Sequence, residues 1–201
     1  MRVCYVLFVV VWIHTCLILP PMTTMTTTTT CKARTHPRDS RIQFDPGPHA
    51  YYLDGAPLSS SVTGVIHHFF EKFDPDEIIS RMKRSRKWRQ GNPSYDKYAH
   101  MSDAEIKQHW SEVGGEAAEL GTEMHANIEN FYNEDPHDES PKEFGLFSEF
   151  HKTHVENLDL EAFRAEWVIY SNKHRVAGCI DMVYRNPKTG NYILADWKRS
   201  K

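Results

Sequence analysis

Residues 163–198, FRAEWVIYSNKHRVAGCIDMVYRNPKTGNYILADWK, carry the strongest secondary-structure pattern in the chain. Three runs rich in β-branched and aromatic residues occupy 163–170, 176–184 and 192–198. SNKH separates the first pair and NPKTG the second, and both are typical turn sequences. The pattern predicts an antiparallel meander of three strands.

Hairpin symmetry predicts which residues of this meander face each other. If the second hairpin is symmetric about the Lys-Thr pair of its turn, Asp181 lies opposite Asp196, and Lys198 points to the face of Asp196. If the first hairpin is symmetric about its Asn-Lys pair, Glu166 lies opposite Cys179 and shares the face of Asp181. A register slip of one residue would scatter these groups over both faces.

Adjacent carboxylates repel each other, and a cation between them relieves the repulsion. Oxygen ligands suit Mg²⁺ or Mn²⁺, and a nearby lysine can act on a metal-bound water. The alternative is that Asp196 and Lys198 simply lie on a solvent-facing strand edge, where alternating charge is common. Spacing alone leaves both interpretations open.

A predicted helix over residues 116–132 supplies further candidates. His125 and Glu129 are four residues apart and share a helix face. Gly121 lies one turn before His125, and we expect it to allow a close backbone approach. The core-facing stripe of this helix consists of Leu120, Met124, Ile128 and Phe131.

Helix-start signals precede two further helices. Asp74 is an N-cap candidate, with Pro75 at the first helical position and Glu77 at the third. Ser102 and Glu105 form a capping box.

Three more expectations concern helix extents. Residues 59–63 offer several N-cap candidates for a helix whose apolar positions Ile66, Phe69, Phe70 and Phe73 recur at helical spacing. The glycine pair at 114–115 is predicted to break the helix that the capping box opens. Residues 142–157 are predicted to form one more helix.

A cationic run places six basic side chains within nine residues. Three interpretations are open: phosphate contacts along a DNA path, a nuclear-localisation-like patch, or a solvated helix face. The residues are Arg81, Lys83, Arg84, Arg86, Lys87 and Arg89.

Composition limits the classes of protein. The 201 residues suffice for one domain with a core, and 40% hydrophobic with 25% charged residues excludes collagen-like and fully disordered chains. The formal net charge of −3 gives no global sign of nucleic-acid binding, so such a site must come from local clustering. The four cysteines are too far apart for a structural zinc finger or a dense disulfide framework.

The first residues are open to several interpretations. Residues 3–19 are mostly apolar and suit a signal peptide, a membrane anchor, a buried segment or sequence translated upstream of a start at Met22. We therefore divide the chain into a signal-like, anchor-like or spurious leader at 1–21, a Thr-rich disordered linker at 22–41 and a domain at 42–201. A start at Met22 would favour the nucleus or mitochondrion, and a genuine anchor would add membrane contact.

Four sequence pieces, in order, resemble the RecB-type branch of the PD-(D/E)xK nucleases, which includes CRISPR-associated adaptation nucleases and mitochondrial genome-maintenance exonucleases. The pieces are GTEMHANIE (121–129), EWV (166–168), GCID (178–181) and DWK (196–198). Each is weak alone, but four in order with short spacings are fairly specific. The resemblance covers about residues 51–201 and extends to SVT at 61–63 and to Trp110.

The resemblance implies an α/β fold, a restriction-endonuclease-like core with helices packed on a central mixed sheet. It implies that His125, Asp181 and Asp196 bind Mg²⁺ or Mn²⁺, that Glu166 supports the site as a further candidate ligand, and that Lys198 is catalytic. Gly121 and Glu129 would be supporting residues.

The family usually continues with a Gln-x-x-x-Tyr helix and another strand, so we expect the domain to be incomplete at its C-terminus. Iron–sulfur members need four cysteines around the core; only Cys31 and Cys179 lie in range here, so we expect no cluster.

The implied function is a metal-dependent DNA nuclease, with an exonuclease acting on single strands or DNA ends favoured over restriction-like cleavage, in repair, recombination or replication. One alternative is a catalytically inactive DNA-binding or interaction module that keeps the fold. Another is a secreted or membrane-anchored protein in which the motifs are coincidental.

Overall fold

The computed structural model describes residues 6–13 and 31–199, which form a mixed α/β structure. The chain divides into two compact units, each considered by itself below. Unit 1 contains Met1–Ile66 and Gly121–Lys201, and unit 2 contains His67–Leu120.

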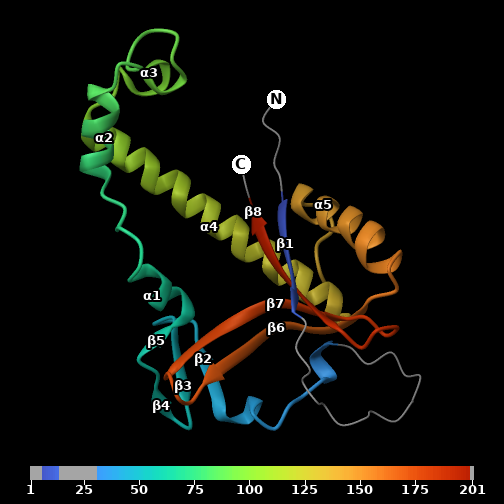
Figure 1. The fold of residues 1–201 in the computed structure, drawn as a ribbon. Helices are drawn as coiled ribbons and strands as arrows, with labels where there is room; N and C mark the ends of the chain where they lie inside the picture. The colour runs from blue at the N-terminus through green and yellow to red at the C-terminus, as the bar shows by residue number, and fades with distance from the viewer. Residues whose placement is uncertain (1–5, 14–30, 200–201) are drawn as a thin grey trace. The chain divides into compact units, whose positions relative to one another are not determined.

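The main sheet of unit 1 is built around the predicted meander. Strands β6 (Glu161–Ser171), β7 (Val176–Arg185) and β8 (Tyr192–Arg199) pair antiparallel in chain order, as the sequence predicted. β1 (Val6–Ile13) pairs antiparallel with β8, and the short β5 (Ser60–Ser61) pairs parallel with β7, which makes the sheet mixed (Figure 1).

The two hairpins differ in how well their registers were predicted. In the second hairpin Met182 pairs with Ala195, the register that the predicted opposition of Asp181 and Asp196 requires. In the first, Val168 pairs with Cys179, so the predicted pairing of Glu166 with Cys179 is wrong by two residues.

The turn explains the shift in the first hairpin. Arg175 has a φ of 53°, in the left-handed region, and belongs to the turn rather than to the strand. Ser171 therefore pairs with Val176 across a four-residue turn. A shift of two preserves the side-chain face, and the flanking pairs Ala165–Met182 and Trp167–Ile180 place Glu166 across from Asp181.

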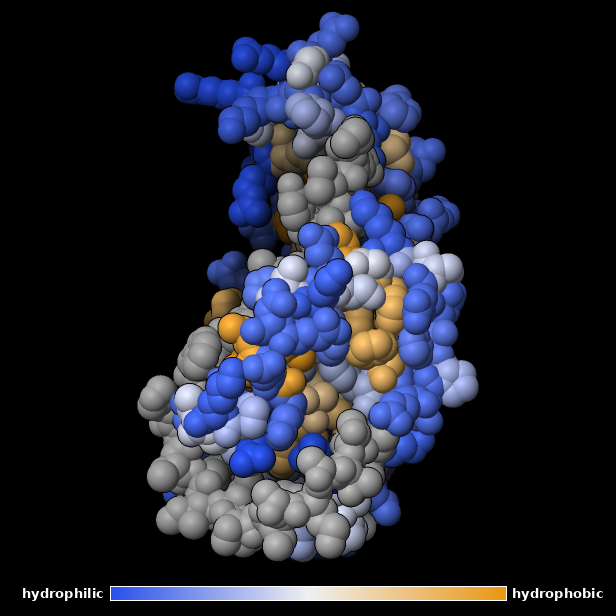
Figure 2. All heavy atoms as spheres, turned by 90° about the vertical axis from the view of Figure 1, so that its right-hand side faces the viewer, coloured by the Kyte–Doolittle hydropathy of each residue, from blue (hydrophilic) through white to orange (hydrophobic). Residues whose placement is uncertain are grey.

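Helices cover the sheet and form the core of unit 1. The second part of α4 (Asp103–Asn133) and α5 (Lys142–Phe150), which continues as a π-helix over His151–Glu156, bury their apolar stripes against β7 and β8. Figure 2 views the molecule from the α5 side, where polar residues cover most of the surface and apolar ones show between them. The core includes Met124, Ile128, Tyr132, Phe147, Met182, Tyr184 and Trp197.

A small second sheet completes unit 1. It consists of β2 (Ile42–Asp45), β3 (Ala50–Leu53) and β4 (Ala56–Pro57). Its buried side chains pack with Tyr170 and Ala177 of the main sheet.

Part of the predicted leader and linker contributes to unit 1. Residues 6–13 form β1, while 14–30 lie outside the described residues. Cys31 is buried in the core, and Asp39 accepts hydrogen bonds from Arg164 at 2.7 Å and Trp167 at 3.3 Å. None of the helices described is long and apolar enough to cross a bilayer.

Helix α4 runs without interruption for 31 residues, so the predicted break at Gly114–Gly115 is wrong. Each glycine costs about 1 kcal/mol relative to alanine in a helix, and the surrounding Glu, Ala and Leu residues favour the helix strongly enough to outweigh that cost. The predicted capping box is confirmed: the Ser102 backbone N–H donates to Glu105 Oε2 at 2.7 Å, and the Glu105 N–H donates to Ser102 Oγ at 3.3 Å.

Unit 2 contains α2 (Pro75–Arg84), α3 (Pro93–Tyr98) and the first part of α4. The predicted cap is confirmed, since Asp74 Oδ1 accepts from the N–H groups of Asp76 and Glu77 at 2.9 and 3.1 Å.

The aromatic helix predicted to reach residue 73 is shorter than expected. Helix α1 (Val62–His67) ends before the phenylalanines. Phe69, Phe70 and Phe73 are 81%, 69% and 68% exposed, so their rings gain little from burial and a longer helix is not stabilised by packing.

Candidate metal centre

The candidate site lies where β7 and β8 separate. Their pairing runs from Arg185–Tyr192 to Met182–Ala195 and, among the described residues, stops there, one residue before Asp181 and Asp196. The Asp181 side chain enters this fork, and its Oδ2 accepts the Trp197 backbone N–H at 2.7 Å. The Asp181 carboxylate thus accepts the hydrogen bond that a β7 backbone carbonyl would accept if the pairing of β7 with β8 continued.

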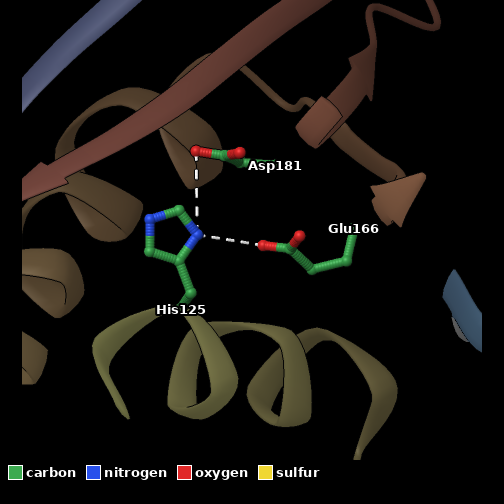
Figure 3. Close-up of side chains that lie close together, drawn as sticks. All are labelled: His125, Glu166 and Asp181. Carbon is green, nitrogen blue, oxygen red and sulfur yellow. Dashed lines mark hydrogen bonds and ion pairs between the residues drawn. The ribbon is translucent and has the colours of Figure 1, made fainter. Parts of the chain in front are cut away.

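Helix α4 supplies the histidine of the site. His125 Nε2 lies 3.0 Å from the Trp197 carbonyl oxygen, while Nδ1 lies 3.0 Å from Glu166 Oε1 and 3.8 Å from Asp181 Oδ2 (Figure 3). One ligand atom from each of the three side chains falls within 4.8 Å of the others, so the group could hold a metal ion.

Local structure places each of these side chains. Met124 and Ile128 are buried and orient the α4 face that carries His125. Glu166 has a φ of 42°, an unusual backbone conformation for a side-chain-bearing residue in a strand. Such strain tends to concentrate at functional positions, and here it falls on a residue of the candidate site.

The electrostatics of the group favour a cation. Burial raises the pKa of Asp181, and the negative charges of Asp196 and Glu166 add to the rise, although the Trp197 amide and His125 oppose it. The Asp181 side chain is only 11% exposed. The hydrogen bond to Glu166 is the main cause that raises the pKa of His125, against the effect of burial.

The donor set fits a divalent ion. Because a carbonyl oxygen can only accept, the contact with Trp197 puts a proton on His125 Nε2. Metal-binding histidines commonly donate their second ring N–H in this way, which leaves the other nitrogen for the ion. Nδ1 faces Glu166 and Asp181, and a cation there would displace any proton that it carries.

Asp196 and Lys198 lie apart from this group of three. Lys198 Nζ is 2.6 Å from Asp196 Oδ2, and the two side chains are 57% and 44% exposed. The structure therefore brings together three of the four predicted metal ligands. That Asp196 also binds metal stays a prediction, since its carboxylate pairs with the lysine.

Two neighbours surround Glu166. Cys179 Sγ donates to Glu166 Oε2 at 3.1 Å, so the two residues that the sequence placed opposite each other are in contact, although the strand register differs by two. Local desolvation and the charge of Glu166 raise the pKa of the Cys179 thiol. Burial and the charge of Glu166 likewise raise the pKa of Glu129, one helical turn from His125.

The predicted close approach at Gly121 is wrong. A Cβ added there would meet no described atom within 4 Å. The close approach occurs at Gly178, three residues before Asp181, where an added Cβ would lie 3.0 Å from Val62 Cγ2. The GCID motif contained this glycine, but spacing alone gave no sign that the start of α1 packs on it.

The basic run belongs to unit 2. Arg81, Lys83 and Arg84 lie on α2, which ends at Arg84, and the other three cations follow in the bend and turn segment. Lys83 Nζ pairs with Asp103 Oδ1 at 2.5 Å. The exposed members are Arg81, Arg84, Arg86, Lys87 and Arg89.

Comparisons of the chain with protein-family models, with curated proteins and with solved structures found no match.

Proposed function

We propose that the chain is a divalent-metal-dependent nuclease that hydrolyses DNA phosphodiester bonds, with a restriction-endonuclease-like core of the RecB type. The observation that carries the proposal is the grouping of His125, Glu166 and Asp181 at the fork between β7 and β8. Lys198 on β8, beside this fork, adds a cationic side chain that could act in the same reaction.

The proposed ion is Mg²⁺ or Mn²⁺, held by His125 Nδ1 and by carboxylate oxygens of Glu166 and Asp181, with Asp196 as a further candidate. Carboxylates suit both ions, and one imidazole is more favourable for Mn²⁺. When bound, the ion would polarise the phosphate and make water a better nucleophile. The tight contacts of Trp197 with Asp181 and His125 would keep both ligands oriented.

Hydrolysis forms a bond from a water oxygen to phosphorus, breaks the bond from phosphorus to the leaving oxygen, and transfers one proton from the water to that oxygen. Lys198 would stabilise the negative charge that develops on the phosphate oxygens, or assist removal of the proton. Its pairing with Asp196 keeps the ammonium group beside the fork.

Holding DNA requires cations, because the chain as a whole has a formal charge of −3. The exposed residues of the basic run are the proposed phosphate contacts. Action on single strands or DNA ends is favoured by family resemblance, as is a place in repair, recombination or replication.

The test is cleavage of labelled single- and double-stranded DNA with Mn²⁺ and with EDTA. We expect metal-dependent cleavage, and we expect Lys198→Ala to reduce it by about 2–4 orders of magnitude while Mn²⁺ binding is retained. Lys188→Ala is the matched control, because Lys188 is an exposed lysine of the β7–β8 turn paired with Asp159.

A second outcome would identify the alternative function. DNA binding without cleavage by the parent, at any Mn²⁺ concentration, would favour a catalytically inactive binding module that keeps the fold. Equal losses in Lys198→Ala and Lys188→Ala would remove Lys198 from the mechanism.

A further inference from the structure

The end of β8 has different neighbours on its two edges. Its edge toward β7 is paired only as far as Ala195, whereas its pairing with β1 continues through Arg199. Val9 lies opposite Asp196 and Leu7 opposite Lys198. Figure 1 shows β1 running beside β8. Among the described strands, β1 is thus the one that accompanies the segment carrying both residues.

Backbone direction gives the β1 residues different roles. In a strand, the N–H and C=O of one residue point to the same side, and successive residues alternate. The N–H and C=O of Trp197 point into the fork, toward Asp181 and His125. The backbone groups of Asp196 and Lys198 therefore point toward β1, and the β1 residues that face them are Val9 and Leu7.

We infer that β1 is a positioning strand for the candidate metal centre. By pairing with Asp196 and Lys198, it fixes the path of β8 beyond the fork, and hence the position of the Trp197 backbone that orients Asp181 and His125. This inference differs from the interpretations of residues 3–19 as a signal peptide, an anchor or spurious sequence. Its consequence for metal binding rests on the proposed function.

The opposite edge of β1 provides a control within the same strand. The alternation that turns the backbone groups of Val9 toward β8 turns those of Val10 away from it. A proline removes the backbone N–H, which breaks a ladder bond at an inward-facing position and is tolerated at an outward-facing edge position. Val9→Pro and Val10→Pro are therefore the same chemical change with opposite expected effects.

The experiment measures amide hydrogen exchange and Mn²⁺ binding in the full chain and both variants. In the parent and in Val10→Pro we expect protected amides at Asp196 and Lys198. In Val9→Pro we expect this protection to be lost and the Mn²⁺ affinity to fall about 10–100-fold, the usual effect of disturbing the groups that orient metal ligands.

Unchanged protection of Asp196 and Lys198 in Val9→Pro would overturn the inference, as would equal losses in the two variants. If Val9→Pro does not fold, Leu7→Pro, nearer the start of β1, provides the same comparison at Lys198 alone. A parent that neither binds Mn²⁺ nor cleaves DNA would refute the proposed function, while the exchange data would still decide whether β1 positions β8.

Discussion

Replacing Asp181 with Asn is the sharpest test of the metal centre, because it removes one charge and nearly preserves shape. The amide oxygen of Asn can still accept the Trp197 N–H that Asp181 accepts at 2.7 Å. The fork should therefore keep its geometry. What changes is the negative charge next to His125 and Glu166.

The size of the effect follows from electrostatics. Two unit charges 4 Å apart interact by about 4 kcal/mol at an effective dielectric constant of about 20. Since about 1.4 kcal/mol corresponds to a tenfold change in affinity, Mn²⁺ binding should weaken by about three orders of magnitude. At 100 times the parent's Kd, Mn²⁺ should stabilise the parent by about 2.7 kcal/mol, or roughly 5–10 °C in Tm, and the variant by a negligible amount.

The metal-free protein should respond in the opposite direction. Burial and neighbouring charges raise the pKa of Asp181 in the folded state. A raised pKa means that stability contributed by this group is present below its unfolded pKa and is lost as the pH rises through the folded pKa. At neutral pH Asp181 therefore destabilises the metal-free fold, and Asp181→Asn should raise the Tm in EDTA.

The assay is thermal unfolding of the parent and Asp181→Asn, in EDTA and in excess Mn²⁺. The matched control is Asp159→Asn, which removes an exposed carboxylate paired with Lys188. We expect the variant to be more stable than the parent in EDTA and less stable in Mn²⁺, with the control following the parent. If Mn²⁺ raised the Tm of Asp181→Asn as much as it raises the Tm of the parent, the proposed site would be refuted.

Three other changes test the fold and the basic run. Hydrogen bonds from Arg164, His36 and Trp167 outweigh burial and lower the pKa of Asp39. Asp39→Asn should therefore reduce the free energy of unfolding, measured in urea near neutral pH, by about 1–3 kcal/mol. The difference from the parent should vanish as the pH falls through the lowered pKa. Gly178→Ala should destabilise the protein by about 1 kcal/mol through its contact with Val62, and Val62→Ala should relieve that contact, so that the two losses are less than additive in a double-mutant cycle; purely additive losses would contradict the contact. DNA binding should weaken similarly for all sequences, with a shallower salt dependence, when alanine replaces Arg84, Arg86 and Lys87, and an unchanged salt slope would identify a solvated helix face.

The sequence predicted the meander well because its strand and turn signals are local. The register of the second hairpin follows from the NPKTG turn and is confirmed by the pairing of Met182 with Ala195. The first hairpin could not be predicted as well, since the left-handed conformation of Arg175 puts this residue in the turn, which spans 172–175 instead of the predicted 171–174, and no residue type at that position requires it. The site residues still share a face because the error was an even number of residues.

The contacts that complete the site are not local, and the sequence could not supply them. The approach of Val62 to Gly178 and the backbone contacts of Trp197 join segments that are 16 to 116 residues apart. The misplaced break in α4 has a different cause, because the glycine signal was real but its cost was too small to end a helix of 31 residues.

The first residues show why an apolar run is ambiguous. A continuous apolar stretch suits a signal peptide, a membrane segment or a buried strand, and periodicity does not distinguish them. Here the deciding feature is the partner: β8 leaves β7 at Ala195, and its other edge is paired with residues 6–13. A strand that must separate from one neighbour to open a site needs the other neighbour to hold its path. The site therefore depends on two features together: the separation of β8 from β7, which places Asp181 beside His125, and the pairing of β1 with Asp196 and Lys198, which holds the end of β8 in position.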